Sequence, residues 1–358
     1  MPSMKPKKWW LYPEIPEQVD TALMEYPRYL RQVLYNRGIN DEQSAAIYLS
    51  ASIEGHDPFL LLDMQKAVDR LLKAIDHNEG IVIYGDYDVD GVSATALMVL
   101  LLQQYGARVH RFIPNRFEEG YGLNNEAIEM LADSGAKVIL TVDCGIRSPR
   151  EAEFARKLGI DLIISDHHHP KDELPNAYAV VCPKREGDPY PYKDLAGVGL
   201  AYKIAQALLE TRPVGDWRAD DWADLVALGT VADIVPLTDE NRMLVRKGIQ
   251  KIRFGSRLGI KALAGVAGKD PTRISAVDIG FILGPRLNAA GRMDSALKAY
   301  ELLVCDSINK AAVLAQELDN QNNERQKATK IAQDCAREKI GEDAKLNLIP
   351  AFFKVPTD

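Results

Sequence analysis

The sequence predicts an α/β fold with a doubly wound, mostly parallel sheet. From residue 80 onward, short apolar segments alternate regularly with longer segments of helical spacing. The apolar segments lack a clean alternation of apolar and polar residues, which is typical of strands covered by helices on both faces. Repeated strand–helix units of this kind build parallel sheets. A helical N-terminal extension and a long C-terminal connector helix complete the expected fold class.

Five strands are expected, each ending before a glycine, a proline or an aspartate. They cover residues 81–84, 109–113, 138–142, 162–165 and 179–182. The helices expected between them cover residues 92–105, 125–133 and 149–158.

Further helices are expected on both sides of the sheet. Helical spacing precedes it at 29–35, 42–49 and 64–75, and follows it at 197–209, 222–232, 242–252, 276–283 and 295–303. Residues 309–340 form one helical pattern without glycine or proline, with Asp306 and Ser307 as candidate caps. At 1.5 Å per residue this helix is about 45 Å long, so we expect it to connect two bodies.

These patterns divide the chain into five expected segments. They are a helical extension (1–75), an α/β domain (76–240), a helical part of the core (241–305), the connector helix (306–341) and a short tail (342–358).

Composition restricts the class of protein. An apolar fraction of 46% is ample for a folded core, and the net charge of −7 provides no global basic field for nucleic acid, so any such groove must be a local patch. The four cysteines are far apart and indicate neither a zinc site nor a disulfide framework. No signal peptide or transmembrane run is visible, so we expect a cytoplasmic protein that does not meet a membrane.

Three aspartates at every second position follow the first strand. They are Asp86, Asp88 and Asp90, within the stretch Gly85-Asp-Tyr-Asp-Val-Asp-Gly91. Carboxylates crowded at a strand end repel one another unless a cation neutralises them, and a divalent metal is the usual answer. The alternative is a solvated acidic turn in which Asp90 caps the next helix.

Two later strands are also followed by residues that can bind a metal. Asp143 follows the third strand, and Asp166, His167 and His168 follow the fourth. Ligands of parallel sheets bind at the carboxyl ends of the strands, so these groups should meet. Carboxylate and imidazole together suit Mn²⁺, and carboxylate oxygens suit Mg²⁺. If the strand continued, the two histidines would point to opposite sides, one to the metal and one to the substrate. An exposed histidine tract is the alternative.

Three other features are open to two interpretations. Asp233 follows an apolar helical run, and it either caps that helix or completes a metal site. Gly197 and Gly199 either offer backbone amides to a phosphate or serve helix packing, which we favour. Cys144 is better explained as a small buried residue than as a soft metal ligand.

Two arginine-bearing loops complement these acids. Arg116 follows the second strand, and Arg286, Asn288 and Arg292 share a glycine-bounded turn. Guanidinium groups suit phosphate oxygens. Pairing of each arginine with a surface carboxylate is the alternative.

The combination and order of these motifs resemble the DHH phosphoesterase superfamily, and within it the RecJ family of single-strand-specific 5′ exonucleases. The resemblance runs from about residue 30 to about residue 340. The matching stretches are Gly85-Asp-Tyr-Asp-Val-Asp-Gly91, Pro114-Asn-Arg116 with Glu119-Gly-Tyr-Gly122, Val142-Asp-Cys-Gly-Ile146, Asp166-His-His168, Ala196-Gly-Val-Gly199, Gly229-Thr-Val-Ala-Asp-Ile-Val-Pro-Leu237 and Gly284-Pro-Arg-Leu-Asn-Ala-Ala-Gly-Arg292.

The resemblance implies roles for individual residues. The implied metal ligands are Asp86, Asp88, Asp90, Asp143, His167 and Asp233, although Asp86 either ligates directly or supports its neighbours. The implied catalytic group is His168, which would contact the scissile phosphate or assist the water, together with Asp143 and Asp90. The implied contacts to nucleic-acid phosphates are Arg116, Arg286, Asn288 and Arg292.

The resemblance also implies an activity. It is removal of nucleotides from the 5′ end of single-stranded DNA, in DNA repair and recombination, with two divalent cations roughly 3.5–4 Å apart. Mn²⁺ is the first expectation and Mg²⁺ the second. The implied partners are single-stranded DNA and a single-strand-binding protein or helicase, and we expect a monomer.

One departure from the family concerns the C-terminal end. RecJ-like proteins continue beyond the long helix into a DHHA1 domain with a Gly-Gly-His motif and then an OB-like domain, and neither is expected in this sequence. Two alternatives to the exonuclease follow: a hydrolase of short oligonucleotides or small phosphodiesters, and an inactive truncated remnant that binds a partner.

Overall fold

The computed structural model describes residues 11–115, 120, 122–171, 173–255, 257–293 and 295–340. The chain divides into two compact units, Met1–Gly55 and His56–Asp358. The first unit contains α1 (Glu17–Ala22), α2 (Arg28–Tyr35) and α3 (Glu42–Ser50). Its small core is built around Leu23, Leu34 and Ala45.

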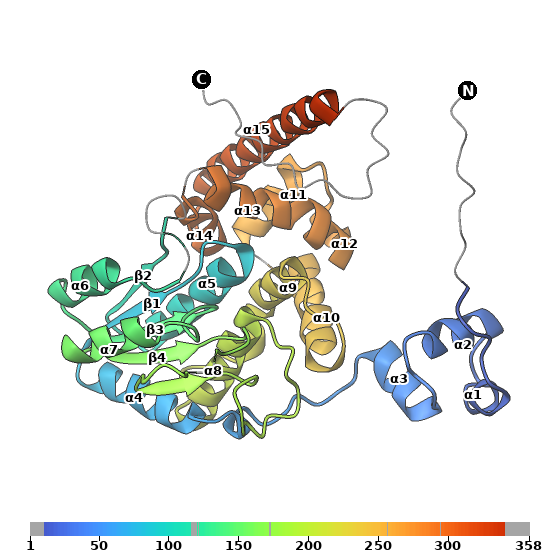
Figure 1. The fold of residues 1–358 in the computed structure, drawn as a ribbon, viewed down its shortest axis with the longest axis horizontal. Coiled ribbons are helices and arrows are strands. Elements are labelled where there is room, and N and C mark those ends of the chain that lie inside the picture. The colour runs from blue at the N-terminus through green and yellow to red at the C-terminus, as the bar shows by residue number, and fades with distance from the viewer. Residues whose placement is uncertain are drawn as a thin grey trace. The chain divides into compact units, whose positions relative to one another are not determined.

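The second unit is built on a five-stranded parallel sheet in the order β2-β1-β3-β4-β5 (Figure 1). The strands are β1 (Gly80–Tyr84), β2 (Val109–Phe112), β3 (Ala136–Val142), β4 (Asp161–Ser165) and β5 (Ala179–Val181). This order is that of a doubly wound sheet. The order in which strands are added reverses between β1 and β3, and such folds place their ligand crevice at that point. The expected fold class is confirmed.

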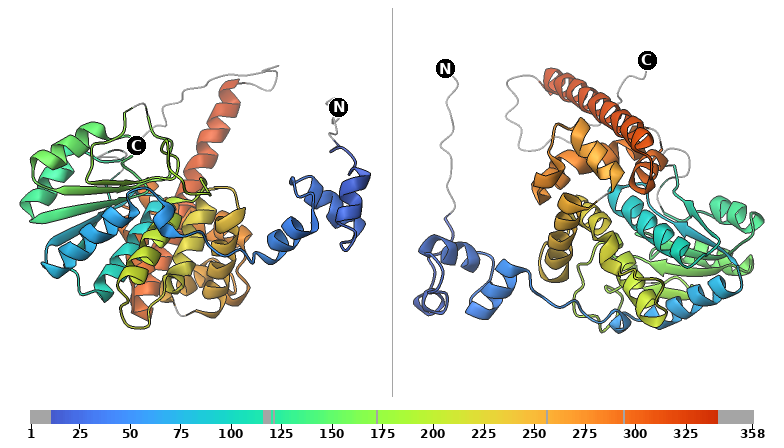
Figure 2. Two further views of the ribbon diagram at one scale, coloured as in Figure 1. Left: turned by 90° about the horizontal axis from the view of Figure 1, so that it is seen from below. Right: turned by 180° about the vertical axis from the view of Figure 1, so that it is seen from behind.

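Helices cover both faces of the sheet (Figure 2). One face packs against α4 (Met64–Asp76), α5 (Val89–Gln104) and α8 (Gly197–Thr211), and the other against α6 (Asn125–Asp133) and α7 (Pro149–Lys157). All five residues of β1 are buried, which explains why its sequence shows no alternation. The side chains of Val82 and Tyr84 lie in the core beneath α6 and α7.

A helical layer follows in the chain. It contains η2 (Ala219–Trp222), α9 (Ala223–Ala232), α10 (Asp239–Phe254), α11 (Leu258–Val266), α12 (Ala276–Asp278), the π-helical turn η4 (Ile279–Leu283), α13 (Gly284–Met293), α14 (Leu297–Val304) and α15 (Ile308–Ile340). The first half of α15 packs on α11, α13 and α14, whereas most of its residues after Asn322 are exposed (Figure 1). The division into five segments, including the connector role of this helix, stays a prediction.

One expectation about local structure is wrong. The glycine-bounded turn at 284–292 is the helix α13, because Gly284 has αR backbone angles and donates its N–H to the Ile279 carbonyl, so the chain continues from the preceding π-helical turn into α13. The helix expected at 276–283 is helical throughout, as a short α-helix followed by that π-helical turn. In addition, α1 and α11 were not expected. Within the described part of the chain, no helix is long and apolar enough to cross a bilayer.

Candidate metal centre

Acidic and imidazole groups from three strand ends converge at the switch point of the sheet. Asp86 lies beyond β1, Asp143 directly follows β3, and Asp166, His167 and His168 directly follow β4. Asp233 joins them from the C-terminal end of α9. The structure therefore brings together the acidic and histidine residues that the sequence placed in one site.

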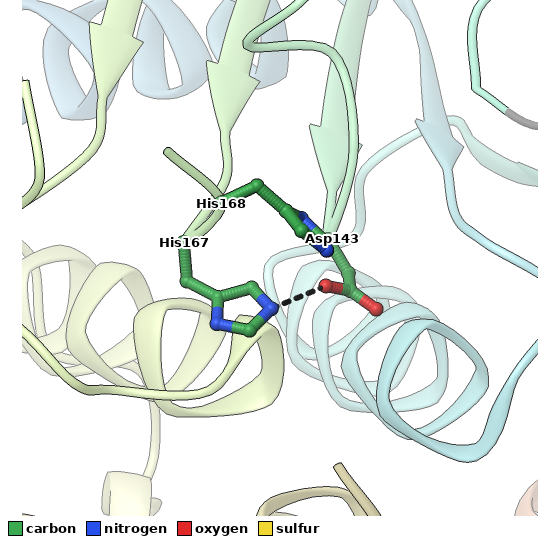
Figure 3. A group of neighbouring side chains, drawn as sticks. All are labelled: Asp143, His167 and His168. Atoms are coloured by element: carbon green, nitrogen blue, oxygen red, sulfur yellow. Dashed lines mark ion pairs between the residues drawn. The ribbon is translucent and has the colours of Figure 1, made fainter. Parts of the chain in front are cut away.

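Three groups of residues could each hold a cation, because the potential ligand atoms within each group all lie within 4.8 Å of one another. They are Asp86, Asp88 and Asp143; Asp90, His167 and Asp233; and Asp143, His167 and His168, which Figure 3 shows. The Nε2 atom of His167 lies 3.1 Å from Asp143, 3.6 Å from Asp233 and 4.0 Å from Asp90, measured to carboxylate oxygens. His167 and Asp143 each belong to two groups, so they link neighbouring sites.

Asp88 holds the loop after β1 in place. Its Oδ1 accepts hydrogen bonds from the backbone N–H of Asp90 at 2.9 Å and of Gly91 at 3.1 Å, so it caps α5. The cap is therefore Asp88 and not Asp90. On the other side of the loop, Asn288 accepts a hydrogen bond from the Val89 N–H at 3.0 Å. Asn288 thus positions the acidic loop from α13.

Asp90 is held by the start of α8. Its two carboxylate oxygens accept hydrogen bonds from the N–H groups of Gly197 (2.6 Å) and Val198 (2.8 Å). The positive end of a helix stabilises a carboxylate in this position. The Gly197 amide, which was considered for a phosphate, is therefore directed at Asp90. Sequence reasoning missed this pairing, because residues 90 and 197 meet only in the folded chain.

Two glycines make room for the acids. A Cβ atom on Gly197 would lie 2.5 Å from the Cβ of Asp143, and one on Gly229 would lie 2.6 Å from Oδ1 of Asp90. Such contacts are impossible unless the acids move. Glycine at these two positions therefore leaves the space that Asp143 and Asp90 occupy.

Gly197→Ala should therefore displace Asp143 and disturb the site. We expect a loss of about 1–3 kcal/mol in unfolding free energy from overpacking, and at least about tenfold weaker Mn²⁺ binding. Urea unfolding and calorimetric titration with Mn²⁺ measure these effects. Gly265→Ala is the matched control, because no atom lies within 4 Å of its added Cβ. Equal behaviour of the two variants would contradict this account.

The two histidines do not alternate along a strand, because β4 ends at Ser165. Both rings belong to one ligand group with Asp143, and their centroids are 4.5 Å apart (Figure 3). The condition under which they would point to opposite sides, a strand that continues beyond residue 165, is therefore not met.

Asp166 orients His168, a role that sequence reasoning did not assign. Its Oδ1 lies 2.8 Å from Nδ1 of His168 and accepts a hydrogen bond from the His168 N–H at 3.0 Å. Its Oδ2 accepts one from the Ile146 N–H at 2.9 Å. The hydrogen bond with Asp166 raises the pKa of His168, and the same bond lowers the pKa of Asp166 against the effect of burial.

Asp166→Asn should release the His168 ring while leaving the other ligand groups in place. We expect hydrolysis of the substrate to slow by about 10–100-fold, the usual effect of losing the partner of a site histidine. The pKa of His168 should also fall, which a pH–rate profile detects. His169→Ala, in the exposed continuation of the same tract, should change neither quantity. An unchanged pH profile in Asp166→Asn would contradict a positioning role.

The electrostatics of the centre favour a bound cation. Burial raises the pKa values of Asp90 and Asp143 well above the ordinary range, and neighbouring carboxylates add to the effect. Burial and the charge of Asp88 raise the pKa of Asp86 to about 7, and burial raises that of Asp233 to about 6. Burial and the nearby His168 lower the pKa of His167 to about 4, so this ring is neutral at pH 7 and can act as a ligand.

Buried polar atoms that form no hydrogen bond point to the same ligand. They are Asp86 Oδ1, Asp143 Oδ1 and both ring nitrogens of His167 in the described part of the chain, although Asp143 Oδ1 and His167 Nε2 face each other at 3.1 Å. Buried polar atoms are almost always paired, so several unpaired ones together need an explanation. Asp143 also has a left-handed backbone angle, φ +66°, which is strained for a residue other than glycine. Carboxylate oxygens and a neutral imidazole fit a divalent cation such as Mn²⁺ or Mg²⁺.

The described residues among those predicted to bind phosphate do not form one cluster; each has its own surroundings. Arg116 lies outside the described residues. Arg286 is mostly buried, with its Nε 2.7 Å from Oδ1 of Asp319, so it joins α13 to α15. Asn288 contacts the acidic loop, and Arg292 is exposed and lines a cavity beside α13. The phosphate-binding roles stay predictions, and the pairing of Arg286 favours a structural role for it.

Comparisons with known sequences show which family the chain resembles. The family "DHH family, N-terminal domain" matches residues 80–230, which contain every strand of the sheet. A single-stranded-DNA-specific exonuclease RecJ from Bacillus subtilis is 44% identical over 309 residues, covering 86% of this chain and 38% of that protein. The RecJ of Escherichia coli is 42% identical over 324 residues, covering 87% of this chain and 55% of that protein. The chain thus spans between a third and somewhat over half of these curated relatives.

The similar solved structures are also RecJ proteins. A crystal structure of exonuclease RecJ bound to manganese is 36% identical with a TM-score of 0.70, and the match covers 76% of this chain and 68% of that chain. RecJ from Thermus thermophilus in complex with Mn²⁺ is 32% identical with a TM-score of 0.73, covering 88% of this chain and 44% of that chain.

Proposed function

The chain belongs to the RecJ family of DHH phosphoesterases, and from this premise we propose that it is a metal-dependent phosphodiesterase that degrades single-stranded DNA from the 5′ end. The observation that carries the proposal is the convergence of five carboxylates and two imidazoles at the switch point of the sheet, with several buried atoms left unpaired. Such a site suits hydrolysis of a phosphodiester, in which negative charge develops on oxygen atoms.

The ligand groups suggest how two divalent cations would be held. Asp86, Asp88 and Asp143 would hold one, and Asp90, His167 and Asp233 the other, with Asp143 and His167 close to both. Bound cations of this kind supply Lewis acidity and lower the pKa of water. Mn²⁺ is the first choice for this mixed donor set; two related RecJ structures contain Mn²⁺ and another contains Mg²⁺.

His168 would contact the phosphate of the substrate. Its side chain is 35% exposed, whereas that of His167 is 7% exposed, so it can reach a ligand outside the protein. Because its pKa is raised by Asp166, it carries a proton over a wider pH range than a free histidine. A protonated imidazole beside the scissile phosphate donates a hydrogen bond to a phosphate oxygen and stabilises its charge.

Digestion of 5′-phosphorylated single-stranded DNA, labelled at its 3′ end, tests the proposal. With Mn²⁺ we expect a ladder of shortening labelled products, and no ladder with EDTA or with a duplex of the same sequence. A dinucleotide run in parallel distinguishes the activity from hydrolysis of short phosphodiesters, which would favour the dinucleotide. Failure to cleave any of these substrates, with normal Mn²⁺ binding, would overturn the proposed activity. A cytoplasmic location, a monomeric state and contacts with a single-strand-binding protein or helicase remain predictions.

A further inference from the structure

We propose that Asn241 positions one of the two candidate cation sites, because its buried side-chain amide joins the two backbone segments that support Asp90 and Asp233. The inference rests on the proposed function, in which Asp90, His167 and Asp233 would hold one of two divalent cations. It extends that function, because it assigns a positioning residue that acts on one cation site and not on the other. Sequence analysis gave Asn241 no role.

Two segments without helix or strand support this cation site. Residues 192–196 lead into α8, whose first amides bind Asp90. Residues 235–237 follow the end of α9, where Asp233 lies, and precede α10. A segment outside helices and sheets has no ladder of backbone hydrogen bonds, so its backbone groups need other partners to fix its position.

Asn241 contacts both segments from the first turn of α10. Its Nδ2 donates a hydrogen bond to the carbonyl of Asp194 at 2.6 Å and to the carbonyl of Pro236 at 3.0 Å. Asp194 lies three residues before the start of α8, and Pro236 lies three residues after Asp233. One amide therefore fixes both the chain that enters α8 and the chain that leaves Asp233.

The side chain at this position serves as a hydrogen-bond donor. Asn241 is fully buried, and its Oδ1 forms no hydrogen bond in the described part of the chain, so the amide acts through its N–H groups. The hydroxyl of Tyr192 has the same function. It donates to the Pro236 carbonyl at 3.0 Å and lies 3.1 Å from Nδ2 of Asn241. Two buried donors thus hold one carbonyl oxygen, which has a lone pair for each of them.

The turn of α10 that carries Asn241 is itself held in place. The neighbouring residue, Glu240, is fully buried, and its Oε1 accepts hydrogen bonds from Lys203 Nζ on α8 and from the His56 N–H, both at 2.9 Å. The Tyr190 hydroxyl donates to Oε2 of the same carboxylate. In addition, α10 packs along α9 (Figure 1). Asn241 is therefore fixed relative to both helices whose ends it positions.

Asp233 depends on this support more than the other two ligands of its site. Its side chain is 22% exposed, whereas that of Asp90 is 0% exposed and that of His167 is 7% exposed. It lies at the end of a helix, so no strand of the sheet holds it. Loss of the Asn241 amide should therefore displace Asp233 and weaken the cation site to which it belongs.

Titration of the full chain with Mn²⁺ tests this role without requiring cleavage. Electron paramagnetic resonance measures the free ion and yields a dissociation constant for each bound ion. Asn241→Leu preserves the branched shape of the side chain but removes the donor. We expect one ion to bind about 10–100-fold more weakly in this variant, and the affinity for the other to change less than about twofold. Asp233→Asn, which removes a ligand directly, identifies the affected ion, because the double variant should still bind the other ion normally.

Two further variants keep the test decisive. Tyr192→Phe keeps the ring but removes the second donor, so it should weaken binding of the same ion by a smaller factor even if Asn241→Leu fails to fold. Arg70→Gln is the control for a general loss of stability, because it breaks ion pairs with Glu79 and Asp161 at the amino ends of β1 and β4. Both ions should bind to that control as they bind to the wild type.

Three results would contradict the positioning role of Asn241. They are unchanged affinities in Tyr192→Phe and in folded Asn241→Leu, an equal loss at both ions, and the same selective loss in Arg70→Gln. A wild-type chain that binds a single ion would overturn this role together with the two-cation centre. Two bound ions without cleavage of single-stranded DNA would instead overturn the proposed activity alone.

Discussion

Asp143→Asn should abolish metal-dependent hydrolysis while the chain remains folded. Asp143 belongs to two of the three ligand groups and lies 3.1 Å from His167, so its loss weakens both candidate cation sites at once. Loss of several kcal/mol of transition-state stabilisation corresponds to a decrease in rate of about a thousandfold or more.

The folded state should tolerate this substitution. Asparagine accommodates the left-handed backbone at this position, and it removes a buried carboxyl group whose pKa is raised by burial. We therefore expect the unfolding midpoint of the cation-free protein to stay the same or to rise. Initial rates on single-stranded DNA at saturating Mn²⁺, together with thermal unfolding, check both expectations. Asp133→Asn, at the exposed end of α6, is the control and should retain full activity. A variant at position 143 with near-normal turnover would refute the assignment of the centre.

The second large expected effect is a dependence of folding stability on pH that a bound cation reverses. Without a divalent cation, the second unit should lose stability as the pH rises from about 6.5 to about 8. Burial and the charge of Asp88 raise the pKa of Asp86 to about 7, and burial raises the pKa values of Asp90 and Asp143 well above the ordinary value. In this window the folded state binds more protons than the unfolded chain, so each proton released costs up to about 1.4 kcal/mol per pH unit.

His167 opposes this trend only at lower pH. Burial lowers its pKa to about 4, so its contribution is lost as the pH falls below the unfolded value of 6.5. Above that value His168, whose pKa is raised by its hydrogen bond with Asp166, adds to the loss of stability from the carboxyl groups, because it too releases a proton from the folded state as the pH rises.

Mn²⁺ should reverse the trend. Cations bind the deprotonated carboxylates, so their stabilising effect grows with pH, and it reaches about 2.7 kcal/mol per site at a concentration of about 100 Kd. Calorimetric unfolding at several pH values, in EDTA and in Mn²⁺, provides the measurement. The pH dependence in EDTA should be shallower in Asp143→Asn. An unfolding midpoint that rises with pH in EDTA would contradict this electrostatic description.

Local patterns in the sequence were sufficient to predict the strands of the sheet and which acidic and histidine residues come together at its edge. Every expected strand overlaps an observed one, because a buried parallel strand needs a short apolar run and its carboxyl end is followed by a turn. Since those ends share one edge, the positions of Asp86, Asp143 and His167 in the sequence already placed them together. Local patterns were less informative for α13, where glycine and proline suggested a turn although the helix begins at those residues.

The amino-acid sequence by itself determined that carboxylates and imidazoles would gather at the end of a parallel sheet, and that the chain belongs among DHH phosphoesterases. Only the tertiary structure decided which groups pair. Asp90 with the amides of α8, Asn288 with the acidic loop and Arg286 with Asp319 are contacts between residues 33 to 199 positions apart. The backbone strain at Asp143 and Ile234 is also visible only in the folded chain. The physical reason is that a strand end depends on local periodicity, whereas hydrogen-bond partners and strained angles depend on how distant helices pack.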